Sequence, residues 1–153
     1  MNSDFKDLLQ SFAKHKVRYL IVGGYAVMHH AQPRYTKDLD LWLEPTEANA
    51  ANVARALREF GIPLIEITER DFAQEGTRFM VGRPPNAIDF LTSVPGLTFA
   101  SCWPNRSTTN DLGFEAIYVG REDLIKAKQI AGRLQDHVDV EELNRNPYRE
   151  ADA

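Results

Sequence analysis

The chain has 153 residues, of which 43% are hydrophobic and 26% are charged, and its formal net charge is -4. These values indicate a globular domain with a sizeable core and exclude a disordered or fibrous chain. The negative net charge argues against nucleic-acid binding by the surface as a whole. Its one cysteine, Cys102, excludes an intramolecular disulfide and a cysteine-based metal cluster. No signal peptide or membrane-spanning run is evident, so we expect a soluble cytoplasmic protein with no membrane partner.

Apolar periodicity, caps and turn residues predict alternating helices and strands. In chain order we expect a helix capped by Ser3, a strand at 17–22, a short helix at 25–31, a strand at 37–43, a helix at 47–60 capped by Thr46, a strand at 64–68, paired strands at 77–81 and 87–92, a short helix at 99–103, a strand at 114–119, and helices at 122–131 and 135–144. Together they predict one α+β domain over residues 1–146, with a mixed sheet and flanking helices. The tail at 147–153 is expected to be frayed.

The first chemical signal is a glycine pair followed by two aspartates. Gly23-Gly24 ends the first strand, and Asp38 and Asp40 flank a leucine at the head of the second. Because residues two apart on a strand face the same side, both carboxylates should point to one place. Such carboxylates raise each other's pKa unless a cation neutralises them, and a hard ion such as Mg²⁺ or Mn²⁺ suits them. The glycines expose backbone amides to a phosphate group.

A third carboxylate, Asp89, alternates with Ile88 and Phe90 on a later strand. An unpaired charge in so apolar a strand costs several kcal/mol. One explanation is a salt bridge to a neighbouring arginine, and the other is that Asp89 joins the first two aspartates around a metal pair.

Other polar residues have simpler explanations. Asp136 and Asp139 share a helix face, which favours a structural pair with Arg133 over a separate metal site with His137. We expect His29 and His30 to be a solvated or packed pair rather than a metal site, and Cys102 and Trp103 to be part of the core.

In these motifs the chain resembles the DNA polymerase β nucleotidyltransferase superfamily, and more closely the small bacterial AbiEii-like nucleotidyltransferases. The matching segments are 23–27, 34–41, 88–93 and 124–140, so the resemblance extends over about residues 17–143. Gly24 stands where many members of the superfamily have a serine. Many relatives also carry an extra helical domain, and without one the acceptor must be recognised by the domain's own surface or by a second subunit.

The resemblance implies roles for the motif residues. Asp38 and Asp40 would bind two Mg²⁺ (or Mn²⁺) ions, and Asp89 would hold the second ion and accept the proton of the attacking hydroxyl. The nucleotide-binding candidates are Gly23, Gly24, Arg34, Lys37, Lys128 and Arg133. For Arg34, simple screening of the carboxylates is an equal alternative. The closing helices would fold back over the sheet through Leu124, Ile125, Ile130 and Leu134.

The resemblance implies transfer of a nucleoside monophosphate from an NTP to a hydroxyl acceptor with release of pyrophosphate. The resemblance does not specify the acceptor, which can be a tRNA end, a protein hydroxyl or a small molecule. It also leaves open whether the protein forms a homodimer or has a toxin–antitoxin partner. One alternative is a non-catalytic binding partner in a toxin–antitoxin or defence system, although such a module has no reason to keep clustered like charges. A metal-dependent phosphohydrolase is the other, and the upstream glycine pair argues against it.

Overall fold

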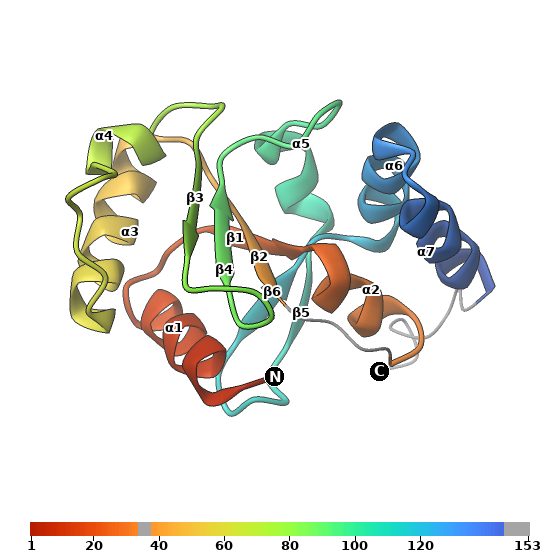
Figure 1. Cartoon of the computed structure of the whole chain (residues 1–153), viewed down its shortest axis with the longest axis horizontal. Coiled ribbons are helices and arrows are strands. Elements are labelled where there is room, and N and C mark those ends of the chain that lie inside the picture. Colours follow the sequence, from red (N-terminus) through yellow and green to blue (C-terminus); the bar gives the residue numbers. More distant parts are fainter. Residues whose placement is uncertain (34–37, 146–153) are drawn as a thin grey trace.

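The centre of the molecule is a six-stranded mixed sheet with the strand order β3-β4-β2-β1-β6-β5 (Figure 1). The computed structural model describes residues 1–33 and 38–145. The strands are β1 (Tyr19–Val22), β2 (Leu39–Leu43), β3 (Arg78–Val81), β4 (Ile88–Leu91), β5 (Ser107–Thr109) and β6 (Ala116–Tyr118). The helices are α1 (Ser3–Lys14), α2 (Gly23–His30), α3 (Glu47–Phe60), α4 (Glu69–Phe72), α5 (Phe99–Cys102), the 3₁₀ helix η1 (Trp103–Asn105), α6 (Arg121–Ala131) and α7 (Leu134–Arg145). The expected tail lies outside the described residues.

Strand pairing brings the predicted motifs together. β2 runs antiparallel to β1 and parallel to β4, so Asp40 has Val22 on one side and Asp89 on the other. β6 runs parallel to β1, and the β3–β4 and β5–β6 pairs are antiparallel. The predicted single α+β domain with a mixed sheet is therefore confirmed.

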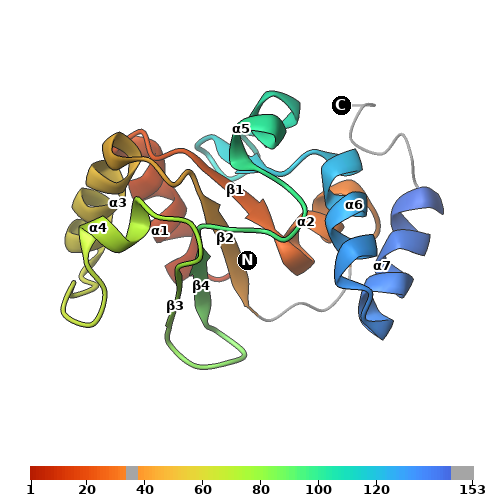
Figure 2. The same cartoon turned by 90° about the horizontal axis from the view of Figure 1, so that it is seen from above.

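Helices cover the sheet in two groups. Figures 1 and 2 show α1, α3 and α4 at one end of the molecule and α6 and α7 at the other. The expected first helix is present as α1, which packs into the core by Phe5, Leu8, Leu9 and Phe12, all of them buried. Its N-cap is Asn2 rather than the predicted Ser3, because the Asn2 side-chain oxygen accepts a hydrogen bond from the backbone N–H of Phe5 at 2.8 Å. No helix in the described part of the chain is long and apolar enough to cross a membrane.

Three expectations about the elements are wrong. Residues 64–68 form no strand, because this segment is an irregular approach to α4 that leaves Ile65 in solvent. The strand β5 was not expected, since a short polar edge strand carries no hydrophobic period. On the closing helices Leu124 and Ile125 are buried as expected, but Ile130 is 47% and Leu134 87% exposed, because α6 and α7 pack on each other and on α2 by other residues.

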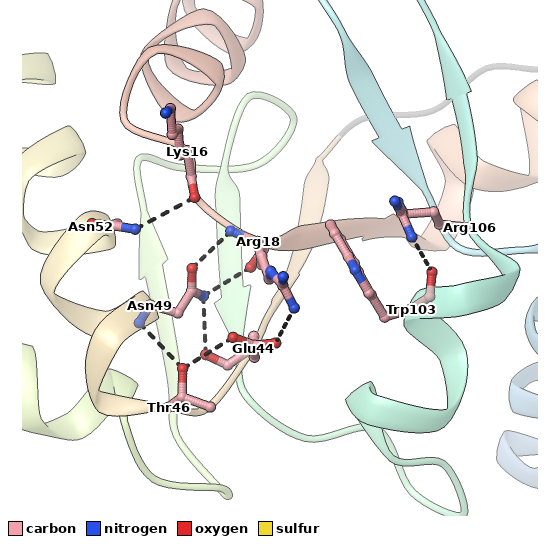
Figure 3. A network of polar contacts seen from close by, with 8 residues as sticks. All are labelled: Lys16, Arg18, Glu44, Thr46, Asn49, Asn52, Trp103 and Arg106. Carbon is pink, nitrogen blue, oxygen red and sulfur yellow. Dashed lines mark hydrogen bonds and ion pairs between the residues drawn. The ribbon is translucent and has the colours of Figure 1, made fainter.

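A buried asparagine ties the far ends of β1 and β2 to the start of α3 (Figure 3). The Asn49 side-chain oxygen accepts a hydrogen bond from the backbone N–H of Arg18 at 2.7 Å. Its amide nitrogen donates to the backbone oxygens of Arg18 at 2.9 Å and Glu44 at 3.0 Å. Since Arg18 precedes β1 and Glu44 follows β2, one side chain sets the position of both strands at the end opposite Gly23 and Asp40.

Replacing Asn49 by alanine should lower the free energy of unfolding by about 2–3 kcal/mol, because three partly buried hydrogen bonds to the backbone are lost. Urea denaturation followed by circular dichroism measures the change. Asn52→Ala is the matched control on the same helix, since Asn52 makes an exposed 3.5 Å contact with the Lys16 oxygen. Equal effects of the two substitutions would contradict the role given to Asn49.

Candidate active site

The turn from β1 into α2 is shaped around Asp40. Gly23 adopts a left-handed backbone with φ of 69°, which favours glycine over other residues. A Cβ atom at this position would overlap the carboxylate oxygen Oδ2 of Asp40. Val22, the N-cap residue of α2, carries no side-chain acceptor, so the first amides of the helix receive no side-chain cap. The glycine therefore allows the Asp40 carboxylate to lie directly against the backbone of the turn.

Gly23→Ala should displace Asp40 and lower the free energy of unfolding by about 3 kcal/mol, from left-handed strain plus overpacking. Thermal denaturation measures this loss. Gly113→Ala is the matched control, because Gly113 has φ of 88° and open space around it. The control should lose about 1 kcal/mol from strain. If both variants lose the same amount, contact with Asp40 does not constrain this position.

The predicted alternation on β2 is confirmed. Leu39 and Leu41 are fully buried in the core, whereas Asp38 and Asp40 on the other side are partly exposed. Asp40 lies beside Asp89 in the parallel register of β2 and β4. Asp38 is tied to the start of β4, since its Oδ1 atom accepts a hydrogen bond from the backbone N–H of Ala87 at 3.1 Å.

The electrostatic environment of Asp40 opposes its negative charge. Burial raises the pKa of this carboxyl to about 6, with further contributions from the charges of Asp89 and Asp38. Arg78 and Lys128 lower the pKa in part. A carboxylate that is this costly to ionise favours the approach of a cation.

Asp89 forms an ion pair with an arginine, which was one of the two explanations that the sequence allowed for this residue. Its side chain is buried, at 3% exposure, on β4. Nε of Arg78 donates to Oδ1 at 3.2 Å and to Oδ2 at 3.0 Å, and the Nη2 atom donates to Oδ2 at 2.5 Å. Arg78 had no place among the predicted site residues. The signal that was available is its position in a strand predicted to pair with the Asp89 strand.

These side chains line a pocket of about 700 Å³. It contains Gly23, Asp40, Asp89, Lys128 and Arg133, residues that the sequence spreads over more than a hundred positions. Asp38 and Gly24 do not line it. A second cavity, of about 890 Å³, lies between α1 and the β3–β4 hairpin and contains none of the predicted site residues in its lining.

The pocket is lined by both polar and apolar side chains. Asp40, Asp89 and Arg78 are among the polar ones. The apolar part of the lining includes Leu124 and Ile130 of α6 and residues of a turn after β4. In that turn Val94 bridges Leu97, and the side chain of Ile130 lies so close to Gly96 that a Cβ there would overlap it. Exposed Ile130 is therefore part of a pocket wall.

Lys128 and Arg133 reach this pocket, as their proposed roles require, but both are engaged by α7. The buried Lys128 ammonium lies 3.3 Å from Asp136 Oδ1 and 2.9 Å from Asp139 Oδ2. Arg133 donates to Asp136 Oδ2 at 2.7 Å. Although burial opposes ionisation, hydrogen bonds from Arg133 and the charge of Lys128 lower the pKa of Asp136 to about 2. The predicted structural pairing of Asp136 with Arg133 is confirmed.

Hard oxygen donors are present, but their arrangement fits a metal ion only in part. Among residues 1–33 and 38–145, no group of three or more histidine, cysteine, aspartate or glutamate side chains is placed so that it could hold a metal. The expected cluster of Asp38, Asp40 and Asp89 is thus not preformed, and Arg78 occupies both oxygens of Asp89. Asp40, next to Gly23 and with its raised pKa, has the properties of a cation ligand.

The remaining predicted residues are accounted for individually. His29 stacks on Tyr118 with a centroid separation of 4.0 Å, and His30 Nε2 lies 2.8 Å from the Val119 oxygen, so the packed interpretation of both histidines is confirmed. Cys102 is buried as expected. Trp103 is only partly buried: its ring stacks on the core residue Phe99 with a centroid separation of 5.5 Å, and Arg18 and Arg106 also lie against it. Arg34 and Lys37 lie outside the described residues.

Comparisons with known proteins place the fold. No protein-family model matches the chain, and no curated protein matches it significantly. Among solved structures, the lincomycin-bound lincosamide antibiotic adenylyltransferase LnuA is similar, with a TM-score of 0.61 and 19% sequence identity. The match covers 94% of this chain and 96% of that one. The chain thus has, over nearly its whole length, the fold of a nucleotidyltransferase that adenylylates an antibiotic.

Proposed function

We propose that this protein is a metal-dependent nucleotidyltransferase that transfers the nucleoside monophosphate of an NTP to a hydroxyl group. The observation that carries the proposal is the contact of Asp40 with the Gly23 turn, next to Asp89, in the lining of a pocket of about 700 Å³. A turn whose backbone amides have no side-chain cap, together with two carboxylates in one pocket, supports a site for a phosphate group and a metal ion. The fold shared with an adenylyltransferase supports the same chemistry, with ATP as the donor.

In this mechanism Gly23 and Gly24 bind the triphosphate through backbone N–H groups at the start of α2. Asp38 and Asp40 would hold Mg²⁺ or Mn²⁺, and Asp89 would hold the second ion. When bound, the metal neutralises phosphate charge and lowers the pKa of the attacking hydroxyl. The acceptor oxygen forms a bond to the α-phosphorus, the bond to pyrophosphate breaks, and the hydroxyl proton passes to a carboxylate, for which we propose Asp89.

The acceptor that fits the pocket best is a small molecule with an apolar face. Apolar lining residues, among them Val94, Leu97, Leu124 and Ile130, give the pocket the character of a small-molecule site, and the volume of the pocket lies within the range of such sites. LnuA acts on a lincosamide, by its name, and was solved with lincomycin bound. For this chain we propose the class alone, an apolar small molecule that presents a hydroxyl to the carboxylates.

The test incubates the purified protein with each α-³²P-labelled NTP, Mg²⁺, and either the low-molecular-weight or the macromolecular fraction of a cell lysate. We expect label from ATP on a compound of the first fraction, and none with Asp40→Asn. Labelled RNA or protein would retain nucleotidyl transfer but contradict the small acceptor. The absence of label with every NTP and fraction would contradict catalysis.

One observation favours the non-catalytic alternative: Asp89 is already occupied by its ion pair with Arg78. A binding partner in a toxin–antitoxin or defence system, of the AbiEii-like kind that the motifs resemble, would leave this ion pair undisturbed. Such a protein should bind no nucleotide even with Mg²⁺ present. Isothermal titration calorimetry with ATP and Mg²⁺ therefore separates the two functions before any acceptor is known.

A further inference from the structure

In the described part of the chain, three cationic side chains line the pocket, and they are not equivalent. Lys128 and Arg133 are held by Asp136 and Asp139, two carboxylates of α7 that have no part in the proposed chemistry. Arg78 is held instead by Asp89, a proposed metal ligand. A ligand that binds Asp89 would therefore change the partner of Arg78 while leaving the pairs of the other two cations in place.

The geometry allows Arg78 to leave Asp89. Arg78 is on β3, an edge strand of the sheet, with its side chain 72% exposed, whereas Asp89 is buried. In the antiparallel register Asp89 lies opposite Met80, so the arginine reaches it diagonally from two residues away on the same face. The exposed end of this ion pair can move without disturbing the core.

The two oxygens of Asp89 cannot serve both partners fully. Arg78 makes three hydrogen bonds to them, one to Oδ1 and two to Oδ2. A carboxylate has about four lone-pair sites, and Arg78 takes three of them, so a divalent cation that binds both oxygens of Asp89 must displace at least part of this contact. The displaced guanidinium would then lie at the mouth of the pocket, where its planar fork matches two oxygens of a phosphate group.

We propose that Arg78 is a phosphate-binding residue that is held on Asp89 until a divalent cation displaces it. The inference rests on the proposed nucleotidyltransferase function and adds to it. It gives the site an order of binding, in which the metal frees the arginine and the arginine then contacts the NTP. Arg78, rather than Lys128 or Arg133, becomes the side chain that neutralises the triphosphate.

Arginine side-chain NMR tests the displacement directly. In ¹⁵N spectra of the wild-type protein, the Nε–Hε signal missing from Arg78→Lys identifies Arg78. We expect this signal to shift when Mg²⁺ is added, and again with ATP whose α–β bridge is a non-hydrolysable methylene. Arg18, paired with Glu44 at the other end of β1, is the internal control and should not shift.

Calorimetry on Arg78→Ala supplies a second, independent readout. Loss of the competing cation should strengthen Mn²⁺ binding about tenfold, whereas affinity for the ATP analogue in the presence of Mn²⁺ should fall about tenfold or more. Arg78→Lys should recover part of the second effect. These opposite signs are expected of a displaced arginine, while a purely structural one would strengthen metal binding and leave nucleotide affinity unchanged.

The outcomes separate this inference from the proposed function. If the wild-type protein binds the metal and the ATP analogue but the Arg78 signal stays unchanged, the displacement is wrong and the nucleotidyltransferase proposal stands. If the wild-type protein binds neither, both are overturned.

Discussion

Asp40→Asn is expected to abolish nucleotide transfer and, at the same time, to stabilise the protein in EDTA. The loss of transfer should be about a thousandfold, because the variant lacks the carboxylate charge that would hold the metal ion. That ion would neutralise the negative charge that develops on the phosphate during transfer. The gain in stability follows from burial and the neighbouring charges of Asp89 and Asp38, which raise the pKa of Asp40 to about 6.

The pH dependence of this stability has a defined sign. A carboxyl whose pKa is raised in the folded state holds its proton more tightly when folded. The stability therefore falls as the pH rises from the pKa in the unfolded chain, near 4, through the pKa in the folded protein, about 6. Above pH 6 the penalty is complete. At pH 7.5 the free energy of unfolding of Asp40→Asn should then be about 2 kcal/mol higher than that of the wild type. The two free energies of unfolding should converge towards pH 4.

Urea denaturation of both proteins at pH 4.5, 6 and 7.5 in EDTA measures this difference. Asp38→Asn is the matched control two residues away on the same strand, and should gain less. With Mg²⁺ and ATP the order should reverse, because ligand binding stabilises the wild type alone. An Asp40→Asn protein that is less stable than the wild type in EDTA would show that Asp40 is a structural residue.

Lys128→Ala is expected to lower the free energy of unfolding by about 3–5 kcal/mol, because it removes the buried cation that Asp136 and Asp139 share, while Asp136 alone keeps its pair with Arg133. Both carboxylates are within 3.3 Å of the lysine ammonium, and all three side chains are buried. The sequence favoured a phosphate-binding role that would spare the fold. The structure instead predicts that most of the effect falls on stability.

Two variants make the comparison sharp. Arg133→Ala should cost less, about 1 kcal/mol, since Arg133 itself is 77% exposed and the buried Asp136 keeps Lys128 as a partner. Combining Lys128→Ala with Asp139→Asn should recover part of the lost stability, because one buried charge is removed. Nucleotide affinity measured on the folded fraction of Lys128→Ala tests the original hypothesis, and a tenfold loss there with an unchanged melting temperature would restore it.

Much of the fold could be predicted because each local signal agreed with the next. The apolar period of residues 47–60, its cap Thr46 and the terminal Gly61 together define α3, and the structure has the helix with those bounds. The alternation around Asp40 placed its carboxylate away from the core for the same reason, since a strand has a fixed period of two. The failed strand at 64–68 and the missed β5 are short segments, in which no period can be established.

By itself the sequence determined which residues form the β1–α2 turn and the aspartate strand, because glycine freedom and strand alternation are local properties. Only the tertiary structure decided how the charges are paired. Arg78 and Asp89 meet across a hairpin, and Lys128 meets Asp136 and Asp139 across two helices. Pairing of this kind depends on sheet register and helix packing, which charge and spacing along the chain do not specify. For the same reason Ile130, apolar and expected in the core, lies in the wall of the pocket.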